Sequence, residues 1–159
     1  MKKNDRFILD IEDMGENGEG IGRLDGYIWF VKDAVIGDRI EASAMKMKKN
    51  FGFARLVRVI EPSACRVEEK CPVARRCGGC QTRAVATEEQ QRFKERKVYN
   101  NLKRIGGLSG LLLPEEKGQE NLKGTEKKRE ETVRMEPIIG MEEPWRYRNK
   151  AQFPFGRDK

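Results

Sequence analysis

The sequence predicts a small closed all-β barrel of the OB-fold type in residues 1–60, followed by a cysteine-rich segment and one helix. Two observations support this prediction. The first sixty residues contain about five short runs with strand-like patterns, separated by turn signals, which is typical of small barrels. All four cysteines then fall between residues 61 and 83, where the strand pattern stops.

The barrel elements follow from the pattern in chain order. Phe7, Leu9 and Ile11 alternate at strand period, and a glycine cluster at residues 15–22 is expected to supply the positive φ angles of a tight connection. The GEGIG sequence within this cluster resembles a nucleotide-binding loop. No helical pattern follows it, so a turn is the better interpretation. The remaining signals are an Asp25-Gly26 hairpin turn, an aromatic run at 27–31, a turn at 36–38, and strands at 39–47 and 53–60.

A helix is predicted over residues 88–105. Thr87 is a suitable N-cap, acidic residues follow it, and Gly106-Gly107 is a stop signal. The apolar stripe of this helix, formed by Val98, Leu102 and Ile105, is short, so its docking face is weakly specified.

The rest of the chain divides by composition. Residues 114–132 carry many charges and almost no apolar side chain, which predicts a flexible insertion. The expected segments are a barrel at 1–60, a cysteine-rich segment at 61–86, a helix at 87–107, an insertion at 108–134, and a strand-like start of a further, truncated domain at 135–159.

Composition limits the function. The 159 residues include 33 basic and 26 acidic side chains, giving a net charge of +7 and a pI near 9.3. No histidine is present, which excludes imidazole catalysis and histidine-held metals. No run is long and apolar enough for a membrane span or a signal peptide, so we expect a cytoplasmic protein with reduced thiols.

The distribution of charge favours a polyanion as partner. After Glu41, every charged side chain of the barrel region up to residue 60 is basic. Residues 66–104 contain eleven basic and five acidic side chains. A solvated face is the alternative interpretation for any single basic run. Three such runs together favour nucleic acid, because each neutralised phosphate releases counterions. The residues predicted to contact RNA are Lys46, Lys48, Lys49, Arg55, Arg58, Arg75 and Arg76.

Aromatic residues in the barrel region favour RNA with exposed bases, which can stack on the rings. The rings belong to Tyr27, Trp29, Phe30, Phe51 and Phe53, and at least half of them are expected to be core residues in so small a barrel.

The cysteines are spaced as Cys65, Cys71, Cys77 and Cys80, with Gly78-Gly79 inside the last pair. Four thiolates can hold a zinc ion tetrahedrally, and they can equally hold a [4Fe-4S] cluster. The spacing alone leaves both alternatives open.

The segments MGENGEGIGRLDGYIWFVKDAVIGDRIEA and KMKKNFGFARLVRVIEPSACRVEEKCPVARRCGGCQ resemble the N-terminal half of the 23S rRNA (uracil-5-)-methyltransferase family. FKERKVYNNLKRIGG and PIIGMEEPWRYRNKAQFPFG are further matches, so the resemblance covers the chain except residues 108–134. It implies an RNA-binding TRAM domain, which is an OB-like barrel, then a [4Fe-4S] segment, a helix and the start of an α/β central domain.

Carried over to this sequence, the resemblance makes Cys71, Cys77 and Cys80 cluster ligands, with the fourth family ligand expected beyond Lys159. Cys65 is then a spectator or a substitute ligand. The sequence departs from the family after CGGCQ, where Thr82–Ala86 replaces a histidine-containing aromatic stretch.

The implied reaction is methylation of uridine at its fifth ring carbon by S-adenosylmethionine, through a catalytic cysteine and a carboxylate base. None of that machinery is expected in this chain, so no catalytic or S-adenosylmethionine-binding residue is assigned. The leading hypothesis is therefore the RNA-binding and cluster-binding part of such an enzyme, monomeric and away from membranes, with 23S rRNA as partner. The alternative is a stand-alone nucleic-acid-binding module with a structural four-cysteine zinc site.

Overall fold

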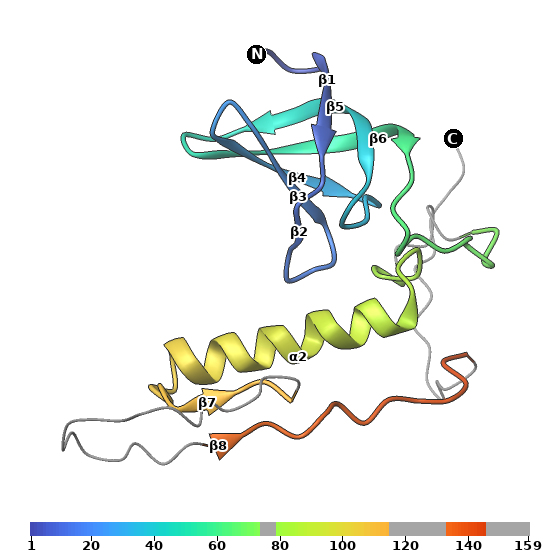
Figure 1. Cartoon of the computed structure of the whole chain (residues 1–159). Coiled ribbons are helices and arrows are strands. Elements are labelled where there is room, and N and C mark those ends of the chain that lie inside the picture. Colours follow the sequence, from blue (N-terminus) through green and yellow to red (C-terminus); the bar gives the residue numbers. More distant parts are fainter. Residues whose placement is uncertain (74–78, 115–132, 146–159) are drawn as a thin grey trace. The chain divides into compact units, whose positions relative to one another are not determined.

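The computed structural model describes residues 1–73, 79–114 and 133–145. These residues belong to two units, Met1–Thr87 and Glu88–Trp145. The first unit contains a six-stranded sheet and the cysteine-rich segment, and the second contains the helix (Figure 1).

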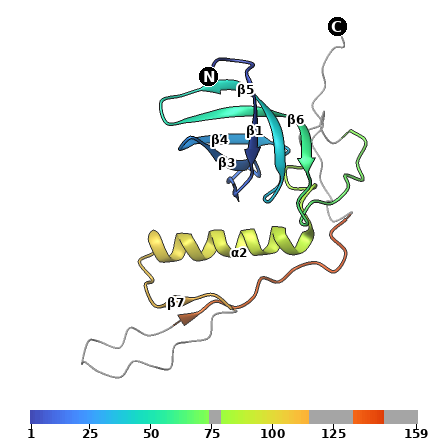
Figure 2. The same cartoon turned by 45° about the horizontal axis from the view of Figure 1, so that its top comes forward.

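The sheet of the first unit is strongly curved (Figures 1 and 2). Its strand order is β1-β5-β6-β4-β3-β2, and among the paired strands only β4 and β6 run parallel. The prediction of about five short strands is confirmed, with the two-residue β2 as an addition. The strands are β1 (Arg6–Asp10), β2 (Asp13–Met14), β3 (Gly20–Leu24), β4 (Tyr27–Lys32), β5 (Arg39–Met47) and β6 (Phe51–Glu61).

The core of this unit lies on the concave face of the sheet. Alternate residues of β1 and β4 are buried there, as strand geometry requires, and the largest of them is Trp29, which is 1% exposed. Phe7 packs on Trp29 with the ring centroids 4.6 Å apart. The small residues Ala42, Ala44 and Ala54 fill the same core from β5 and β6.

The chain leaving β1 crosses β3. The Glu12 amide donates a hydrogen bond of 2.8 Å to the Ile21 carbonyl, and the Ile11 amide donates one to the Asp38 carbonyl. A Cβ atom on Gly22 would collide with the Asp10 carbonyl oxygen and with the Leu9 side chain. Glycine at position 22 therefore allows β1 and β3 to approach closely.

One interpretation of the glycine cluster was wrong. Within residues 15–22 only Gly18 has a positive φ, of 79°, whereas Gly20 and Gly22 lie inside β3 and are required for close packing. The Asp25-Gly26 hairpin is confirmed, because both residues have positive φ and connect β3 to β4 as a primed turn does.

The second unit is built on α2 (Thr87–Arg104), with the parallel pair β7 (Leu111–Leu112) and β8 (Val133–Arg134). The helix prediction is confirmed to within one residue at each end. The helix ends as expected, since Gly107 has a φ of 72° and the Leu108 amide bonds the Leu102 carbonyl. The segment after β8 runs alongside α2 (Figures 1 and 2), where the Ile138 amide donates a 2.5 Å hydrogen bond to Glu95 Oε1.

No residue of α2 is buried, and its stripe of Val98, Leu102 and Ile105 is exposed. The flexible insertion predicted at 114–132 and the strand-like run from Arg146 onward lie almost entirely outside the described residues. Within the described ranges, no helix has the length and apolar character that crossing a membrane requires.

Replacing Gly22 with alanine should destabilise the first unit by about 1–3 kcal/mol or more, because the added methyl group meets backbone that cannot move aside. Urea unfolding followed by circular dichroism measures this loss. Ile8→Ala is the control, since Ile8 is 51% exposed on β1 and its truncation should change stability by about 0.5 kcal/mol or less. Equal stability of Gly22→Ala and the native chain would contradict the close crossing.

Candidate nucleic-acid interface and cysteine loop

Three phenylalanine rings gather on the outer face of the sheet. The parallel register of β4 and β6 pairs Phe30 with Phe53, and Phe51 precedes Phe53 by two residues on the same face. The three ring centroids lie 5.6 to 5.7 Å apart, two of the pairs edge to face. Phe53 is 36% exposed, so one ring of the cluster is open to a stacking partner.

The other two aromatic residues of the prediction belong to the inner face. Trp29 is buried, and Tyr27 packs against the core while its hydroxyl bonds the Phe51 carbonyl. Two of the five rings are therefore core residues, which is fewer than the expected half or more. Strand alternation is a signal that places Phe30 and Trp29 on opposite faces of the sheet, since neighbouring residues in a strand face opposite ways.

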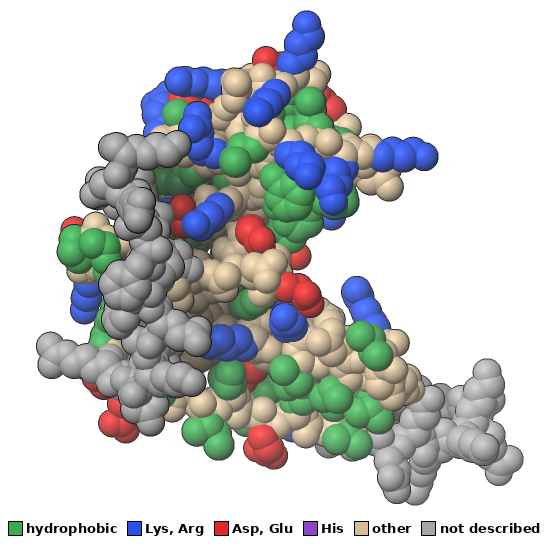
Figure 3. All heavy atoms as spheres, turned by 180° about the vertical axis from the view of Figure 1, so that it is seen from behind, with side chains coloured by type: hydrophobic (Ala, Val, Ile, Leu, Met, Phe, Trp, Pro, Cys, Tyr) green, Lys and Arg blue, Asp and Glu red, His purple; other side chains and the backbone are tan. Residues whose placement is uncertain are grey.

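Basic side chains border the phenylalanine cluster. Lys46 on β5 lies opposite Phe53, and Lys48 Nζ lies 5.0 Å from the centroid of the Phe51 ring. Lys46, Lys48 and Lys49 are exposed and have no acidic partner among the residues that the structure describes. Figure 3 shows exposed hydrophobic side chains of the first unit with Lys and Arg side chains beside them.

Arg55 and Arg58 differ in their surroundings. Arg55 is exposed beside Lys32 on the same face as the rings, as the register of β4 and β6 requires. Arg58, which is also predicted to contact RNA, already has an acidic partner: the β5–β6 register places it across from Glu41, and Arg58 Nε lies 2.7 Å from Glu41 Oε2.

Glu41 also pairs with Arg6, at 3.4 Å. The hydrogen bond from Arg58 holds the pKa of the Glu41 carboxyl below its ordinary value, and it outweighs the partial burial that raises this pKa. The carboxylate therefore stays charged, and Arg58 is engaged before any partner binds.

The cysteine-rich segment is a loop whose two ends are paired. Arg66 and Val85 form an antiparallel bridge, the Val67 amide donates to the Ala84 carbonyl, and the Ala86 amide donates to the Cys65 carbonyl. Cys71 and Cys80 lie in the loop that this pairing closes, and both are exposed. Cys65 lies at the base of the loop and is half-buried.

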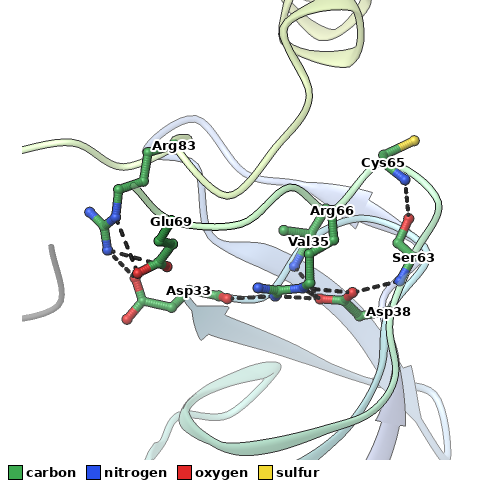
Figure 4. A network of polar contacts seen from close by, with 8 residues as sticks. All are labelled: Asp33, Val35, Asp38, Ser63, Cys65, Arg66, Glu69 and Arg83. Carbon is green, nitrogen blue, oxygen red and sulfur yellow. Dashed lines mark hydrogen bonds and ion pairs between the residues drawn. The ribbon is translucent and has the colours of Figure 1, made fainter. Parts of the chain in front are cut away.

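A buried ion pair fixes the base of this loop on the barrel (Figure 4). The Asp38 side chain is fully buried in the turn before β5, and Arg66 Nη2 donates a 2.6 Å hydrogen bond to Asp38 Oδ2. The amides of Val35 and Ser63 donate to the same carboxylate. Arg66 Nη2 also donates to the Asp33 carbonyl, so the guanidinium spans two parts of the β4–β5 connection.

Arg83 provides a second attachment, also drawn in Figure 4. Its guanidinium is 9% exposed and lies 3.5 Å from Glu69 on one arm of the loop and 3.8 Å from Asp33 on the barrel. It also donates a 2.6 Å hydrogen bond to the Cys80 carbonyl. The backbone that carries Cys80 therefore has a polar attachment through Arg83 in addition to any group that its thiolate would hold.

The ligand assignment stays a prediction. Cys77, Arg75 and Arg76 lie outside the described residues, and within the described part of the chain no three Cys, Asp or Glu side chains gather as a metal site would. The donor chemistry still suits a sulfur-held group, because Cys71 and Cys80 are exposed and the sequence contains no histidine that could compete as a ligand.

Sequence reasoning missed the residues that anchor the loop. Asp38 and Arg66 are 28 positions apart, and neither belongs to a spacing pattern that would pair them. Only the fold shows that the turn before β5 faces the first residues after Pro62. The available signal was weak: Asp38 follows Ile36-Gly37 in a predicted turn, and nothing in the turn itself explains why a charged residue stands there.

Comparison with known proteins identifies the first unit. Residues 4–57 match the TRAM domain family. The barrel is a TRAM domain. A solved structure that it resembles is a conserved protein of Methanococcus maripaludis, which is 37% identical over 36% of this chain and 81% of that chain, with a TM-score of 0.35.

The sequence similarity extends well beyond the TRAM domain. A protein of Halalkalibacterium halodurans named as an uncharacterized RNA methyltransferase is 40% identical over 98% of this chain, and a protein of the same description from Clostridium tetani is 37% identical over 100% of it. A Clostridium acetobutylicum protein of that description is 39% identical. By sequence the chain is similar to these RNA methyltransferases along nearly its whole length, and it spans about three-tenths of the length of these relatives.

Arg66→Met should lower the free energy of unfolding of the first unit by about 3–5 kcal/mol, because it leaves the buried Asp38 carboxylate without its cation. Urea denaturation measures the loss. Arg39→Met is the matched control: Arg39 pairs with Asp10 at the surface, 3.3 Å away, and its removal should cost less than about 1 kcal/mol. Equal losses of unfolding free energy in the two variants would show that the Asp38–Arg66 pair contributes no more to stability than an exposed pair.

Proposed function

We propose that the chain is the RNA-binding and cluster-binding part of an S-adenosylmethionine-dependent RNA (uracil-5-)-methyltransferase, with 23S rRNA as substrate. The observation that supports RNA binding best is the outer face of the TRAM barrel, where a cluster of rings with Phe53 exposed lies among lysines without acidic partners in the described residues. Single-stranded RNA can bind both the rings and the lysines of this face, because its bases stack on aromatic rings and its phosphates attract cations.

The methyl-transfer chemistry belongs to the whole protein. Relatives named as RNA methyltransferases are more than three times as long as the matched region, so catalysis and S-adenosylmethionine binding are assigned to regions beyond this chain. The contribution of this chain is to bind the RNA and to hold it near that machinery. The expected partner is therefore RNA rather than a membrane, and the chain is expected to act as a monomer in the cytoplasm.

The cluster proposal rests on donor chemistry. Cys71, Cys77 and Cys80 would hold three irons of a [4Fe-4S] cluster, with the fourth ligand outside this chain or supplied by Cys65. The exposed position of Cys71 and Cys80 in one closed loop is compatible with a group shared between them. Such a cluster would order the loop, and no step of methyl transfer is assigned to it.

Neutralising Lys46, Lys48 and Lys49 to glutamine should weaken RNA binding and reduce the magnitude of the salt slope by about 2, because each phosphate contact to a single strand contributes about 0.7. Filter binding of a radiolabelled RNA hairpin loop at several salt concentrations gives the slope. The matched control is Arg6, Arg23 and Arg39 to glutamine, which changes net charge equally but removes cations already paired with Glu41, Glu12 and Asp10. Identical salt slopes in the two triple variants would show that Lys46, Lys48 and Lys49 do not contact the RNA and are merely solvated.

Anaerobic purification should yield about four irons per chain with broad absorbance near 400 nm, whereas one zinc ion would support the stand-alone module instead. Cys77→Ser and Cys80→Ser should release the metal. Cys65→Ser should retain it if the fourth ligand lies outside this chain, and should release it if Cys65 is that ligand. Metal analysis by mass spectrometry checks each variant. Metal retained in both Cys77→Ser and Cys80→Ser would refute the ligand assignment.

A further inference from the structure

A pocket of about 450 Å³ opens beside the phenylalanine cluster. Strands β4, β5 and β6 contribute its sheet side, which includes Phe30 and Phe53. The β2–β3 turn contributes Asn17, Gly18 and Glu19, and the cysteine loop contributes Gln81. The volume lies within the usual range of small-molecule sites, which suits one base with its ribose and excludes a paired duplex.

The sheet side of the pocket is a stacking surface. Phe53 and Phe30 lie 5.7 Å apart with their planes tilted by 34°, and Phe51 supports both rings edge to face. Three mutually packed rings have little rotamer freedom left to lose. A planar base can therefore stack on Phe53 without an entropic cost from ordering the ring.

The remaining lining carries amide groups that can read the edge of a base. Gln81 and Asn17 each present a carbonyl oxygen and an NH₂ group, and Asn17 Nδ2 donates to Glu19 at 3.2 Å. Gln81 reaches this place because Gly18 leaves room for it: a Cβ atom on Gly18 would lie 3.2 Å from Gln81 Cβ and 3.0 Å from Thr82 Cγ2. The cysteine loop is thus in direct contact with the TRAM barrel at the pocket.

Two lysines at the rim of the pocket can meet the phosphates of a nucleotide. Lys32 and Lys46 line the pocket, are exposed, and have no acidic partner within the described residues. Two carboxylates also line it. Arg83 lies 3.8 Å from that of Asp33 and offsets its charge, whereas Glu19 accepts a hydrogen bond from Asn17 and pairs with no cation among the described residues. The phosphates on either side of a bound base would meet the two lysines.

We propose that this pocket holds one unpaired nucleobase of the bound RNA, stacked on Phe53, with Gln81 facing its hydrogen-bonding edge and Lys32 and Lys46 facing its phosphates. The proposal rests on the proposed RNA binding and deepens it. It makes the TRAM barrel and the cysteine loop two halves of one site, and it gives Gln81 a role in base selection.

The test measures binding of the chain to a single-stranded RNA hexamer that carries 2-aminopurine at one position, and to the same hexamer with one abasic site. Stacking on Phe53 should quench the 2-aminopurine fluorescence, and the abasic hexamer should bind at least about five-fold more weakly. Unquenched fluorescence together with unchanged affinity for the abasic RNA would overturn the proposal, and this arm needs no variant that must fold.

Phe53→Leu should abolish the quenching and weaken binding of the intact hexamer about five-fold to ten-fold, whereas Phe53→Tyr keeps a ring and should stay within about two-fold. Ile8→Ala is the control for loss of an exposed apolar side chain. Gln81→Ala should reduce the difference in affinity between hexamers of different bases and leave the affinity for the abasic hexamer unchanged. Equal base preference in Gln81→Ala and the native chain would remove Gln81 from base selection.

The two proposals fail in different ways. If the native chain binds no RNA at any salt concentration, the proposed function fails, and the pocket with it. If it binds RNA with the expected salt slope while Phe53→Leu and the abasic site change nothing, RNA binding stands and the nucleobase pocket is wrong.

Discussion

The arrangement of the first unit depends on the buried contact between Asp38 and Arg66. A carboxylate that is fully buried needs donors, and Asp38 has them from Arg66 and from the amides of Val35 and Ser63. A pair of this kind adds little net stability over two apolar residues, but it strongly disfavours any arrangement in which one partner is missing. Its main effect is to fix position: the chain that leaves β6 must return across the β4–β5 turn, which sets where the cysteine loop begins.

The second constraint is the parallel pairing of β4 with β6. It places Phe30 next to Phe53 and Lys32 next to Arg55, while the residues between them point into the core. A shift of one residue would move the rings inside and Trp29 outside, so burial of Trp29 specifies the outer surface as well as the core. The same register that stabilises the barrel therefore produces the face that is proposed to bind RNA.

The sequence allowed most local structure to be predicted, because its signals are local. Asp25-Gly26 requires a primed turn, Gly106-Gly107 ends a helix, and the limits of β5 were predicted to the residue. Contacts between distant segments had no such signal. The Asp38–Arg66 pair, the neutralisation of Arg58 by Glu41, and the contact between Gly18 and Gln81 all depend on strand order and register, which periodicity does not determine.

The contact between Gly18 and Gln81 links the two proposed activities physically. Arg83 holds the Cys80 carbonyl, Gln81 follows Cys80 directly, and Gln81 then lines the pocket beside Phe53. A group bound to the Cys80 thiolate would restrict the same stretch of backbone and so favour the arrangement of Gln81 that the pocket contains. By linkage, whatever free energy the bound group contributes to ordering Gln81 must reappear as tighter binding of a base at the pocket, and a base there must in turn favour retention of the group. If both proposals hold, a cysteine loop placed directly after a TRAM barrel, and attached to it through Arg66 and Arg83, would make RNA affinity depend on the group that the cysteines hold.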